Sequence, residues 1–253
     1  MNQSVKFTII TITYNAAQWL ERTILSILSQ SYGNIEYVII DGSSTDGTVD
    51  IIRQYASGIS FWISEPDKGL YDAMNKGLQH ATGDYVWFIN AGDTLPHADL
   101  VQRIAQKIEK RKQLPDVIYG ETAIVDANGK MLGMRRLRPP KKLSWKSFRM
   151  GMLVCHQSFI ARREIAPLYD LNYRLSADYD WCIRCLKEAK YVCNTNQILS
   201  NFLEAGMSTQ QRKASLKERY AIMCKYYGKF ATTLLHGWFA VRFYAAKLFK
   251  GRV

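Results

Sequence analysis

Several common signatures are missing from this 253-residue sequence, and each absence narrows what the protein can be. Its five cysteines are an odd number without the spacing of a disulfide framework, which suits a reducing compartment. Cys182 and Cys185 form a C-x-x-C pair without a second ligand pair, so we expect core cysteines and no zinc or redox site. The amino terminus has no basic flank followed by an apolar segment, so we predict no signal peptide. Together these absences predict a cytoplasmic protein.

A glycine-rich phosphate loop is also missing. The 16 glycines form neither a G-x-G-x-x-G pattern nor a Walker pattern. The phosphates of a bound nucleotide would therefore have to be held by side chains and a metal ion. This absence disfavours NAD and P-loop nucleotides as ligands.

What the sequence does contain is an alternation of short apolar runs and amphipathic segments, and its 47% apolar composition supports a sizeable core. We predict strands over 7–13, 37–40, 59–64, 84–89 and 116–119, separated by helices over 16–30, 48–56, 70–81 and 98–112. Asn15 is the expected N-cap of the first helix. This alternation is typical of βαβ units, so we predict an α/β fold with a mostly parallel central sheet flanked by helices.

The alternation breaks after residue 120. Asn128-Gly129 predicts a hairpin turn between strands over 122–126 and 131–134. A mobile loop is expected around the two adjacent prolines at 139 and 140, and helices are expected over 178–189 and 210–228.

Positive charge is concentrated in two segments. The formal net charge is +12, yet residues 135–149 alone hold seven Lys/Arg and no acid, and residues 203–253 hold ten Lys/Arg against two acids. We expect a localised anionic partner, which could be a membrane face, a phosphate-bearing substrate or nucleic acid. The stretch 231–250 is too interrupted for a membrane span, which needs roughly 20 mostly apolar residues. It is either an interfacial helix on an anionic membrane or a helix packed on the domain.

Acidic side chains follow several of the predicted strands. Ligands of open α/β sheets bind beyond the carboxyl ends of the strands, and four acids fall in loops there: Asp41, Asp46, Asp67 and Asp93. Four carboxylates on one rim repel each other unless a cation or a hydrogen-bond donor offsets them. Since hard cations prefer oxygen ligands, a divalent metal that bridges a carboxylate to a diphosphate would be such an offset.

Six short motifs in a fixed order carry a family resemblance. They are T-Y-N (13–15), D-G-S-S-T-D-G-T (41–48), E-P-D-K-G-L-Y-D-A-M-N-K-G (65–77), G-D-Y-V-W-F-I-N-A-G-D (83–93), H-Q (156–157) and S-A-D-Y-D-W (176–181). In this order the chain resembles a family 2 glycosyltransferase of the GT-A fold, of the bacterial polysaccharide-assembly type. The resemblance covers roughly residues 6–205.

The resemblance implies roles for individual residues. Asp93 would bind Mg²⁺ or Mn²⁺, and through it the diphosphate of a nucleotide-sugar donor, and Asp178 matches the catalytic base. The remaining positions would line the substrate site: Thr13, Tyr14, Asn15, Asp41, Ser43, Asp67, Lys68, Gly69, Tyr71, Asn90, Ala91, Gly92, His156, Gln157 and Trp181. Trp181 would stack on an acceptor sugar, and UDP is the donor nucleotide that the family suggests.

The chain departs from the family pattern at three positions. One nucleotide-side acid is absent before Asp41, Asn90 replaces the first carboxylate of the metal motif, and Ala177 replaces the acid that commonly precedes the base. The first two put in doubt how the donor is held, and the third concerns the surroundings of the base.

Glycosyl transfer from a nucleotide sugar needs both remaining acids. The leaving diphosphate gains negative charge that a metal can neutralise, and the acceptor hydroxyl must lose a proton, which a carboxylate can take. One acid on each side of the reacting carbon gives single displacement with inversion. Asp180 is a rival base, although helical geometry should point it elsewhere.

The expected organisation is therefore a glycosyltransferase domain over 1–205 followed by a basic amphipathic helical segment over 206–253. Within the domain, a donor half of about 1–120 precedes an acceptor half of about 121–205. The expected acceptor is a glycan or a polyprenyl-pyrophosphate-linked glycan at the inner face of the cell membrane, approached through 135–149 and 225–253. The alternative is a non-catalytic binder of nucleotide sugars or nucleic acid, although no nucleic-acid-binding signature is present. A nucleotidyltransferase would need a glycine-rich basic loop that 13–19 does not provide.

Overall fold

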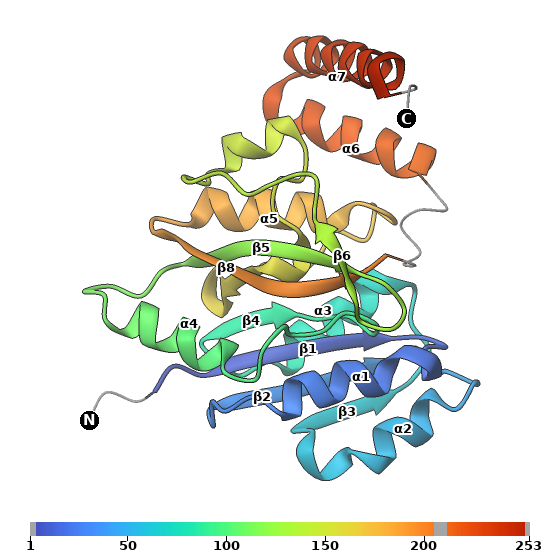
Figure 1. The fold of residues 1–253 in the computed structure, drawn as a ribbon, viewed down its shortest axis with the longest axis vertical. Coiled ribbons are helices and arrows are strands. Elements are labelled where there is room, and N and C mark those ends of the chain that lie inside the picture. The colour runs from blue at the N-terminus through green and yellow to red at the C-terminus, as the bar shows by residue number, and fades with distance from the viewer. Residues whose placement is uncertain (1–3, 205–211, 251–253) are drawn as a thin grey trace.

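The molecule is built around a single mixed sheet (Figure 1). The structure is a computed structural model that describes residues 4–204 and 212–250. Among these residues the strand order is β3-β2-β1-β4-β7-β5-β6, and β8 pairs with β5. The strands are β1 (Phe7–Thr13), β2 (Ile35–Asp41), β3 (Phe61–Ser64), β4 (Tyr85–Phe88), β5 (Val117–Val125), β6 (Met131–Met134), β7 (Phe159–Arg162) and β8 (Val192–Leu203). The predicted α/β class is confirmed.

The first four strands form the parallel half of the sheet. Thr13 of β1 lies opposite Asp41 of β2, which in turn lies opposite Ser64 of β3. Three strands therefore end at the same level, and β4 runs parallel beside β1. As predicted, the loops that follow these strands meet at one edge of the sheet.

Helices bury both faces of this half. Along β1, Phe7 and Ile9 belong to one buried cluster and Ile10 and Ile12 to another, because successive side chains of a strand point to opposite faces. The first cluster is covered by the helices α1 (Ala17–Leu28), α2 (Thr48–Gln54) and α4 (Leu100–Glu109), and the second by α3 (Leu70–His80) and α5 (Ala177–Glu188). All five helices were predicted, with boundaries shifted by a few residues.

The other half of the sheet is mixed and holds the strands that the sequence did not reveal. The predicted hairpin is confirmed, with Gly129 at φ 82°, but its first strand is continuous with the predicted strand over 116–119 and forms β5. Two strands were missed. β7 runs antiparallel between β4 and β5, and β8 runs parallel to β5. β8 carries many Asn, Thr and Ser residues and so has no apolar run.

Two helices complete the chain at the end of the molecule farthest from β3 (Figure 1). α6 spans Arg212–Tyr227 and packs on α5, while α7 spans Lys229–Lys250 and packs on α6. Within the described part of the chain, no helix is both long and apolar enough to cross a membrane. The predicted loop over 135–149 ends in a short 3-10 helix, η2 (Trp145–Met150), that contacts α5 and α7.

Candidate active site

The loop after β2 is organised by Asp41. Its side chain is fully buried, and its carboxylate accepts hydrogen bonds from the backbone N–H of Ser44 (2.9 Å), from the Ser44 hydroxyl and from the Ser64 hydroxyl of β3 (2.6 Å). These donors offset the cost of burying the charge. Asp41 therefore fixes the shape of the loop through these hydrogen bonds.

Asn15 joins the loop after β1 to the loop after β2. Its Oδ1 accepts the N–H of Thr45 (2.9 Å), and its own N–H donates to the Ser44 hydroxyl (2.8 Å). The predicted N-cap role is wrong, because the helix begins at Ala17 and Asn15 has a left-handed φ of 46°. Ser43 is also left-handed, at φ 61°. Such backbone conformations cost free energy and concentrate at functional sites.

Gly42 brings a third loop into contact with the first two. A Cβ atom at this position would lie 2.5 Å from Oδ2 of Asp67 and 3.3 Å from the ring of Tyr14. A side chain at position 42 would therefore require the Asp67 carboxylate to move. Asp67 also accepts the N–H of Gly69 (2.7 Å), where φ is 114°, and Lys68 donates its N–H to Asp72 at the start of α3. The Tyr14 side chain is 63% exposed and is open to a ligand.

Asp93 closes the turn 90–93 that follows β4. Its side chain is 5% exposed. Oδ1 accepts the N–H of Leu203 at the end of β8 (3.0 Å), and Oδ2 accepts the amide of Gln157 (2.9 Å). Burial raises the pKa of Asp93 to about 7, although these two donors and the Arg22 guanidinium act in the opposite direction. The anion is thus under-compensated by the protein, and a cation would stabilise it.

The turn 90–93 can contribute oxygen ligands to a divalent metal. Each Asp93 oxygen accepts one hydrogen bond and retains a lone pair. Oδ1 of Asn90 is buried and has no hydrogen-bond partner within 4–204 and 212–250. Among the residues that the structure describes, no three His, Cys, Asp or Glu side chains form a complete metal cage. Mg²⁺ commonly binds through one or two carboxylates plus substrate phosphates. The turn fits a cation of that kind.

His156 and Gln157 lie between the Asp93 turn and the surroundings of Asp178. Gln157 reaches Asp93, whereas Nε2 of His156 lies 2.7 Å from the Tyr169 hydroxyl. The Tyr169 ring stacks on Tyr71, with centroids 5.6 Å apart. Burial lowers the pKa of His156 to about 4, and the charge of Asp178 opposes that shift. Both side chains are buried, so they position their neighbours.

Asp178 lies in the first turn of α5 and is partly exposed. Its Oδ1 accepts the Tyr71 hydroxyl of α3 (3.0 Å) and the N–H of Tyr179 (2.9 Å). Burial and the Asp178 carboxylate raise the pKa of the Tyr71 phenol well above its ordinary value, so Tyr71 stays a donor. One oxygen of Asp178 is thus anchored by hydrogen bonds. Contacts through Tyr71, Tyr169, His156 and Gln157 connect Asp178 to Asp93.

Asp180, the rival base, points away from this site. Its side chain is fully buried and accepts hydrogen bonds or ion pairs from Arg184 (2.7 Å), Lys225 (3.2 Å) and the Tyr226 hydroxyl (2.8 Å). Two of these partners belong to α6. Asp180 therefore fastens α6 to α5 and has no access to a substrate.

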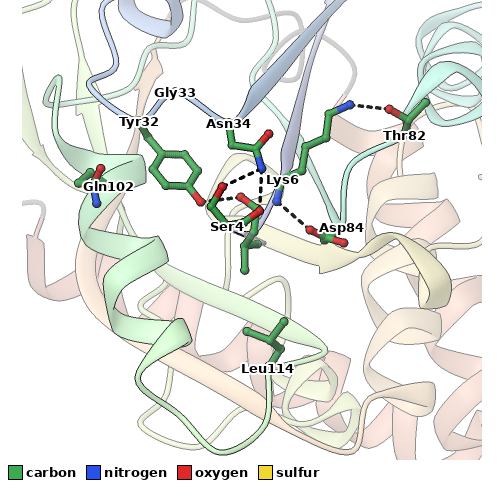
Figure 2. A pocket seen from close by; sticks show the side chains of 10 residues that line it. Ser4, Lys6, Tyr32, Gly33, Asn34, Thr82, Asp84, Gln102 and Leu114 are labelled. Carbon is green, nitrogen blue, oxygen red and sulfur yellow. Dashed lines mark hydrogen bonds between the residues drawn. The ribbon is translucent and has the colours of Figure 1, made fainter. Parts of the chain in front are cut away.

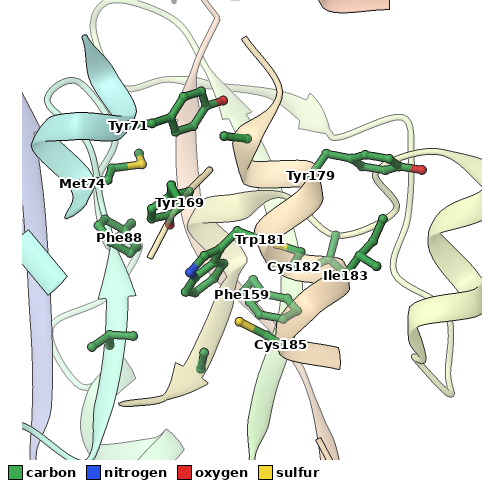
Figure 3. Packing of buried hydrophobic residues seen from close by; sticks show 14 of the residues in the cluster. Tyr71, Met74, Phe88, Phe159, Tyr169, Tyr179, Trp181, Cys182, Ile183 and Cys185 are labelled. Carbon is green, nitrogen blue, oxygen red and sulfur yellow. The ribbon is translucent and has the colours of Figure 1, made fainter. Parts of the chain in front are cut away.

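The structure contradicts the expectation that Trp181 stacks on an acceptor sugar. Its side chain has no exposed surface, stacks on Tyr169 at 5.2 Å between centroids and donates its indole N–H to the carbonyl of Pro167 (Figure 3). It cannot stack on a sugar. Cys182 and Cys185 are buried free thiols in the same cluster, as predicted.

Arg219 of α6 is a further candidate for the site, and the sequence did not reveal it. The neighbouring Glu218 accepts the N–H groups of Arg174 (2.9 Å) and Leu175 (2.8 Å), which draws α6 against the segment before α5. The guanidinium opposes the rise in the pKa of Tyr71 that burial and Asp178 cause, so it lies near that phenol. Its Nε is buried without a hydrogen-bond partner among the described residues.

The remaining predicted positions lie at the same edge. Thr13 ends β1 with its hydroxyl buried and without a hydrogen-bond partner. Ala91 donates its N–H to the carbonyl of Ile12 (3.2 Å), and Gly92 donates to the Thr23 hydroxyl (2.9 Å). The turn 90–93 is thereby held between β1 and α1.

A hollow of about 1000 Å³ lies at the opposite edge of the sheet (Figure 2). Residues just before β1, β2 and β4 line it, and they already bond to one another: Lys6 to Thr82 and Asp84, and Asn34 to Ser4. Ligands of such sheets bind beyond the carboxyl ends of the strands. The loops around Asp41 and Asp93 are therefore the better candidate.

Comparison with known proteins shows what this chain is similar to. The model of the family described as "Glycosyl transferase family 2" matches residues 8–166. A PGL/p-HBAD biosynthesis glycosyltransferase of Mycobacterium bovis is 35% identical over 193 residues, which cover 74% of this chain and 72% of the relative.

Two solved structures share the fold. TarS 1-349 of S. aureus in complex with UDP-GlcNAc has a TM-score of 0.71 at 18% identity, with 86% of this chain and 64% of that chain covered. The mannosyltransferase PcManGT of Pyrobaculum calidifontis, in complex with GDP-Man and Mn2+, has a TM-score of 0.64 at 17% identity, with 93% and 71% covered.

Proposed function

The chain belongs to glycosyl transferase family 2, and from this premise we propose that it is an inverting glycosyltransferase that uses a nucleotide-diphosphate sugar. UDP is the nucleotide that we propose, and the acceptor is a glycan or a polyprenyl-pyrophosphate-linked glycan of a bacterial surface polysaccharide. The related M. bovis protein is named for PGL/p-HBAD biosynthesis, and TarS was solved with UDP-GlcNAc. The proposed organisation keeps a donor half of about 1–120, an acceptor half of about 121–205 and a C-terminal segment over 206–253.

One observation carries the proposal. Asp178 is a partly exposed carboxylate, and its contacts through Tyr71, Tyr169 and His156 lead to the buried Asp93 turn. Two acids in unlike surroundings, joined in one site, suit a reaction that needs a proton acceptor and a charge-neutralising group. If the two acids lay on opposite sides of the molecule, the proposal would fail.

In the proposed mechanism Asp178 accepts the proton of the acceptor hydroxyl. Its Oδ1 is fixed by Tyr71 and by the N–H of Tyr179, which leaves Oδ2 for the hydroxyl. The acceptor oxygen attacks the anomeric carbon, and the bond from that carbon to the donor diphosphate breaks on the opposite face. Such a single displacement inverts the configuration at the anomeric carbon.

The leaving group would be held on the Asp93 side. Asp93 and Asn90 are the residues that we propose for Mg²⁺ or Mn²⁺, because they offer oxygen ligands and an under-compensated charge. When bound, the cation supplies Lewis-acid neutralisation of the diphosphate. Gln157 and the N–H of Leu203 keep the Asp93 carboxylate in place. The presence of Mn2+ in the PcManGT complex supports this assignment.

Arg219 would add a fixed cation beside the base. A guanidinium with a buried, unpartnered Nε is suited to bind a phosphate oxygen. We propose that it contacts the donor diphosphate once the donor is bound. The C-terminal segment would then contribute directly to the reaction.

The test is a donor screen. Purified full-length protein is incubated with UDP-, GDP- and TDP-sugars and Mn²⁺, and release of nucleoside diphosphate is measured. We expect slow release from one donor, lost on addition of EDTA and in Asp93→Ala. Donor binding without turnover under every condition, or tight binding of single-stranded nucleic acid in its place, would support the non-catalytic alternative.

A further inference from the structure

The two basic segments of the chain meet in the folded protein. The Tyr227 hydroxyl at the end of α6 donates to the carbonyl of Trp145 in η2 (2.7 Å), and the two rings are stacked with centroids 5.7 Å apart and planes at 4°. η2 also contacts α7. Residues 135–149 and the C-terminal helices therefore form one surface, although about 80 residues of sequence separate Trp145 from Tyr227.

Cations gather around this junction. Lys146 of η2 and Lys187 of α5 both lie over the Trp145 ring, at 5.7 and 5.8 Å from its centroid. The adjoining basic side chains of the 135–149 segment are exposed, namely Lys141, Lys142 and Arg149. A hollow of about 700 Å³ beside α5 adds Lys190, while Glu164 and Glu188 are the acids that line it. Asp180 neutralises only Arg184 and Lys225. The surface keeps a surplus of positive charge.

An apolar stripe borders these cations. Phe230, Leu234 and Trp238 of α7 follow each other at intervals of four residues and are 80%, 61% and 55% exposed. Residues four apart lie on the same side of a helix. The other side of α7 is packed, because Leu235 and Phe239 lie against the core cluster. Helix α7 is therefore apolar on two sides, only one of which is covered by the protein.

The same surface adjoins the proposed base. The Tyr179 hydroxyl donates to the carbonyl of Phe148 in η2, and Tyr179 follows Asp178 directly. η2 also packs on α5. A ligand spread over η2 and α7 would thus lie next to the helix that carries Asp178.

We propose that η2 and α7 form a docking surface for an anionic phospholipid bilayer, on which α7 lies in the interface. Phe230, Leu234 and Trp238 enter the boundary of the acyl chains, and the lysines and arginines of 141–149 contact the lipid phosphates. Charge complementarity selects this occupant, since exposed aromatic and aliphatic side chains beside clustered cations are the composition of interfacial helices. The proposal concerns binding and is independent of the transfer reaction.

Vesicle sedimentation of the full-length protein tests the surface. The probes are phosphatidylcholine vesicles with and without phosphatidylglycerol, an anionic lipid that gives the vesicles a negative surface potential. We expect binding to the anionic vesicles that weakens at about 0.5 M salt, where screening is strong. A triple variant, Phe230→Ser with Leu234→Ser and Trp238→Ser, should bind at least about tenfold more weakly, as should Lys146→Glu with Arg149→Glu.

The matched control is Met131→Ser with Leu132→Ser. These side chains of β6 are 51% and 52% exposed and lie outside η2 and α7, so binding should not change. Circular dichroism and thermal unfolding check that each variant is folded. Unchanged vesicle binding of the folded triple variant would overturn the proposal. The proposal would also be overturned if the triple substitution changed the protein from a dimer to a monomer in sedimentation equilibrium. The same holds if the wild-type protein bound RNA and no vesicles.

Discussion

The loops that follow β1 to β4 form one edge of the sheet, which we call the rim. The acids of this rim and those of the face formed by α5 and α6 differ in how they are held. At the rim, Asp41 and Asp67 bond to donors a few residues away or on the next strand. On the α5–α6 face, the partners of Asp178 and Asp180 come mainly from distant segments, namely α3 and α6. The loops after β2 and β3 are thus shaped mainly by nearby sequence. Asp93, which is held by Gln157 and Leu203, and the face that carries the proposed base depend on long-range contacts.

The two acids of α5 sharpen the contrast. Asp178 is partly exposed, and among the described residues only its Oδ1 accepts a hydrogen bond. Asp180 is fully buried and is bonded to two cations and a phenol. They are two residues apart, so they point to different sides of the helix. The first is suited to chemistry and the second to holding α6 in place.

The largest effect that we expect comes from Asp178→Asn. Removing a general base costs about 10²- to 10⁴-fold in rate, so transfer should fall by about 10³-fold while donor binding, measured by calorimetry, stays near that of the wild type. Asp180→Asn is the matched variant and should retain most of the rate at a temperature where it is folded. If Asp180→Asn loses transfer and Asp178→Asn keeps it, the contrast between the two acids is wrong.

A second prediction concerns His156, which lies between the two regions. In the unfolded chain it titrates near 6.5, but burial lowers its folded pKa to about 4. The stability it contributes is complete above pH 6.5 and is lost as the pH falls through about 4. A shift of this size corresponds to about 3 kcal/mol.

His156→Gln removes that dependence. The loss of unfolding free energy between pH 7 and pH 4, measured by urea denaturation, should be about 3 kcal/mol smaller than in the wild type. His97→Gln, at an exposed position, is the control substitution. An identical pH profile in His156→Gln and wild type would mean that the imidazole is not buried in its neutral form.

Much of the rim could be predicted from sequence, for a physical reason. Buried parallel strands are continuous apolar runs, and the acids that follow them necessarily gather at one edge. β8 could not be predicted in this way, because blocks of polar residues interrupt its apolar residues. Its end is nevertheless part of the site, since Leu203 donates to Asp93.

The α5–α6 face was predicted only in part. The role of Asp178 was predicted from a family motif alone, because the helix dipole makes an acid common in the first turn of any helix. Trp181 was assigned wrongly because the motif gives no information on which side of α5 faces the core. Arg219 had no local signal: α6 carries polar side chains around its whole circumference, and only in the folded protein does the charge of Arg219 act on the pKa of Tyr71.

We expect a smaller effect from Asp180→Ala than from the first two substitutions. Its carboxylate bonds to three partners, but Arg184 and Lys225 are 27% and 47% exposed and can be rehydrated. Loss of hydrogen bonds to a charged group should therefore lower the free energy of unfolding by about 2 kcal/mol. Urea denaturation followed by tryptophan fluorescence measures this. A change within about 0.5 kcal/mol, as for ordinary surface substitutions, would show that Asp180 does not fasten α6.

The smallest predicted effect decides whether α6 belongs to the active site or only supports it. If Arg219 contacts the donor diphosphate, Arg219→Ala should lower kcat by about tenfold, the equivalent of 1.4 kcal/mol. Arg219→Lys should recover only part of that loss, because a lysine cannot form the forked hydrogen bonds of a guanidinium. Lys217→Ala, an exposed position on the same helix, is the control. A purely supporting role would instead lower thermal stability in both Arg219 variants and leave kcat of the folded protein unchanged. That outcome would confine the chemistry to the strand ends and α5.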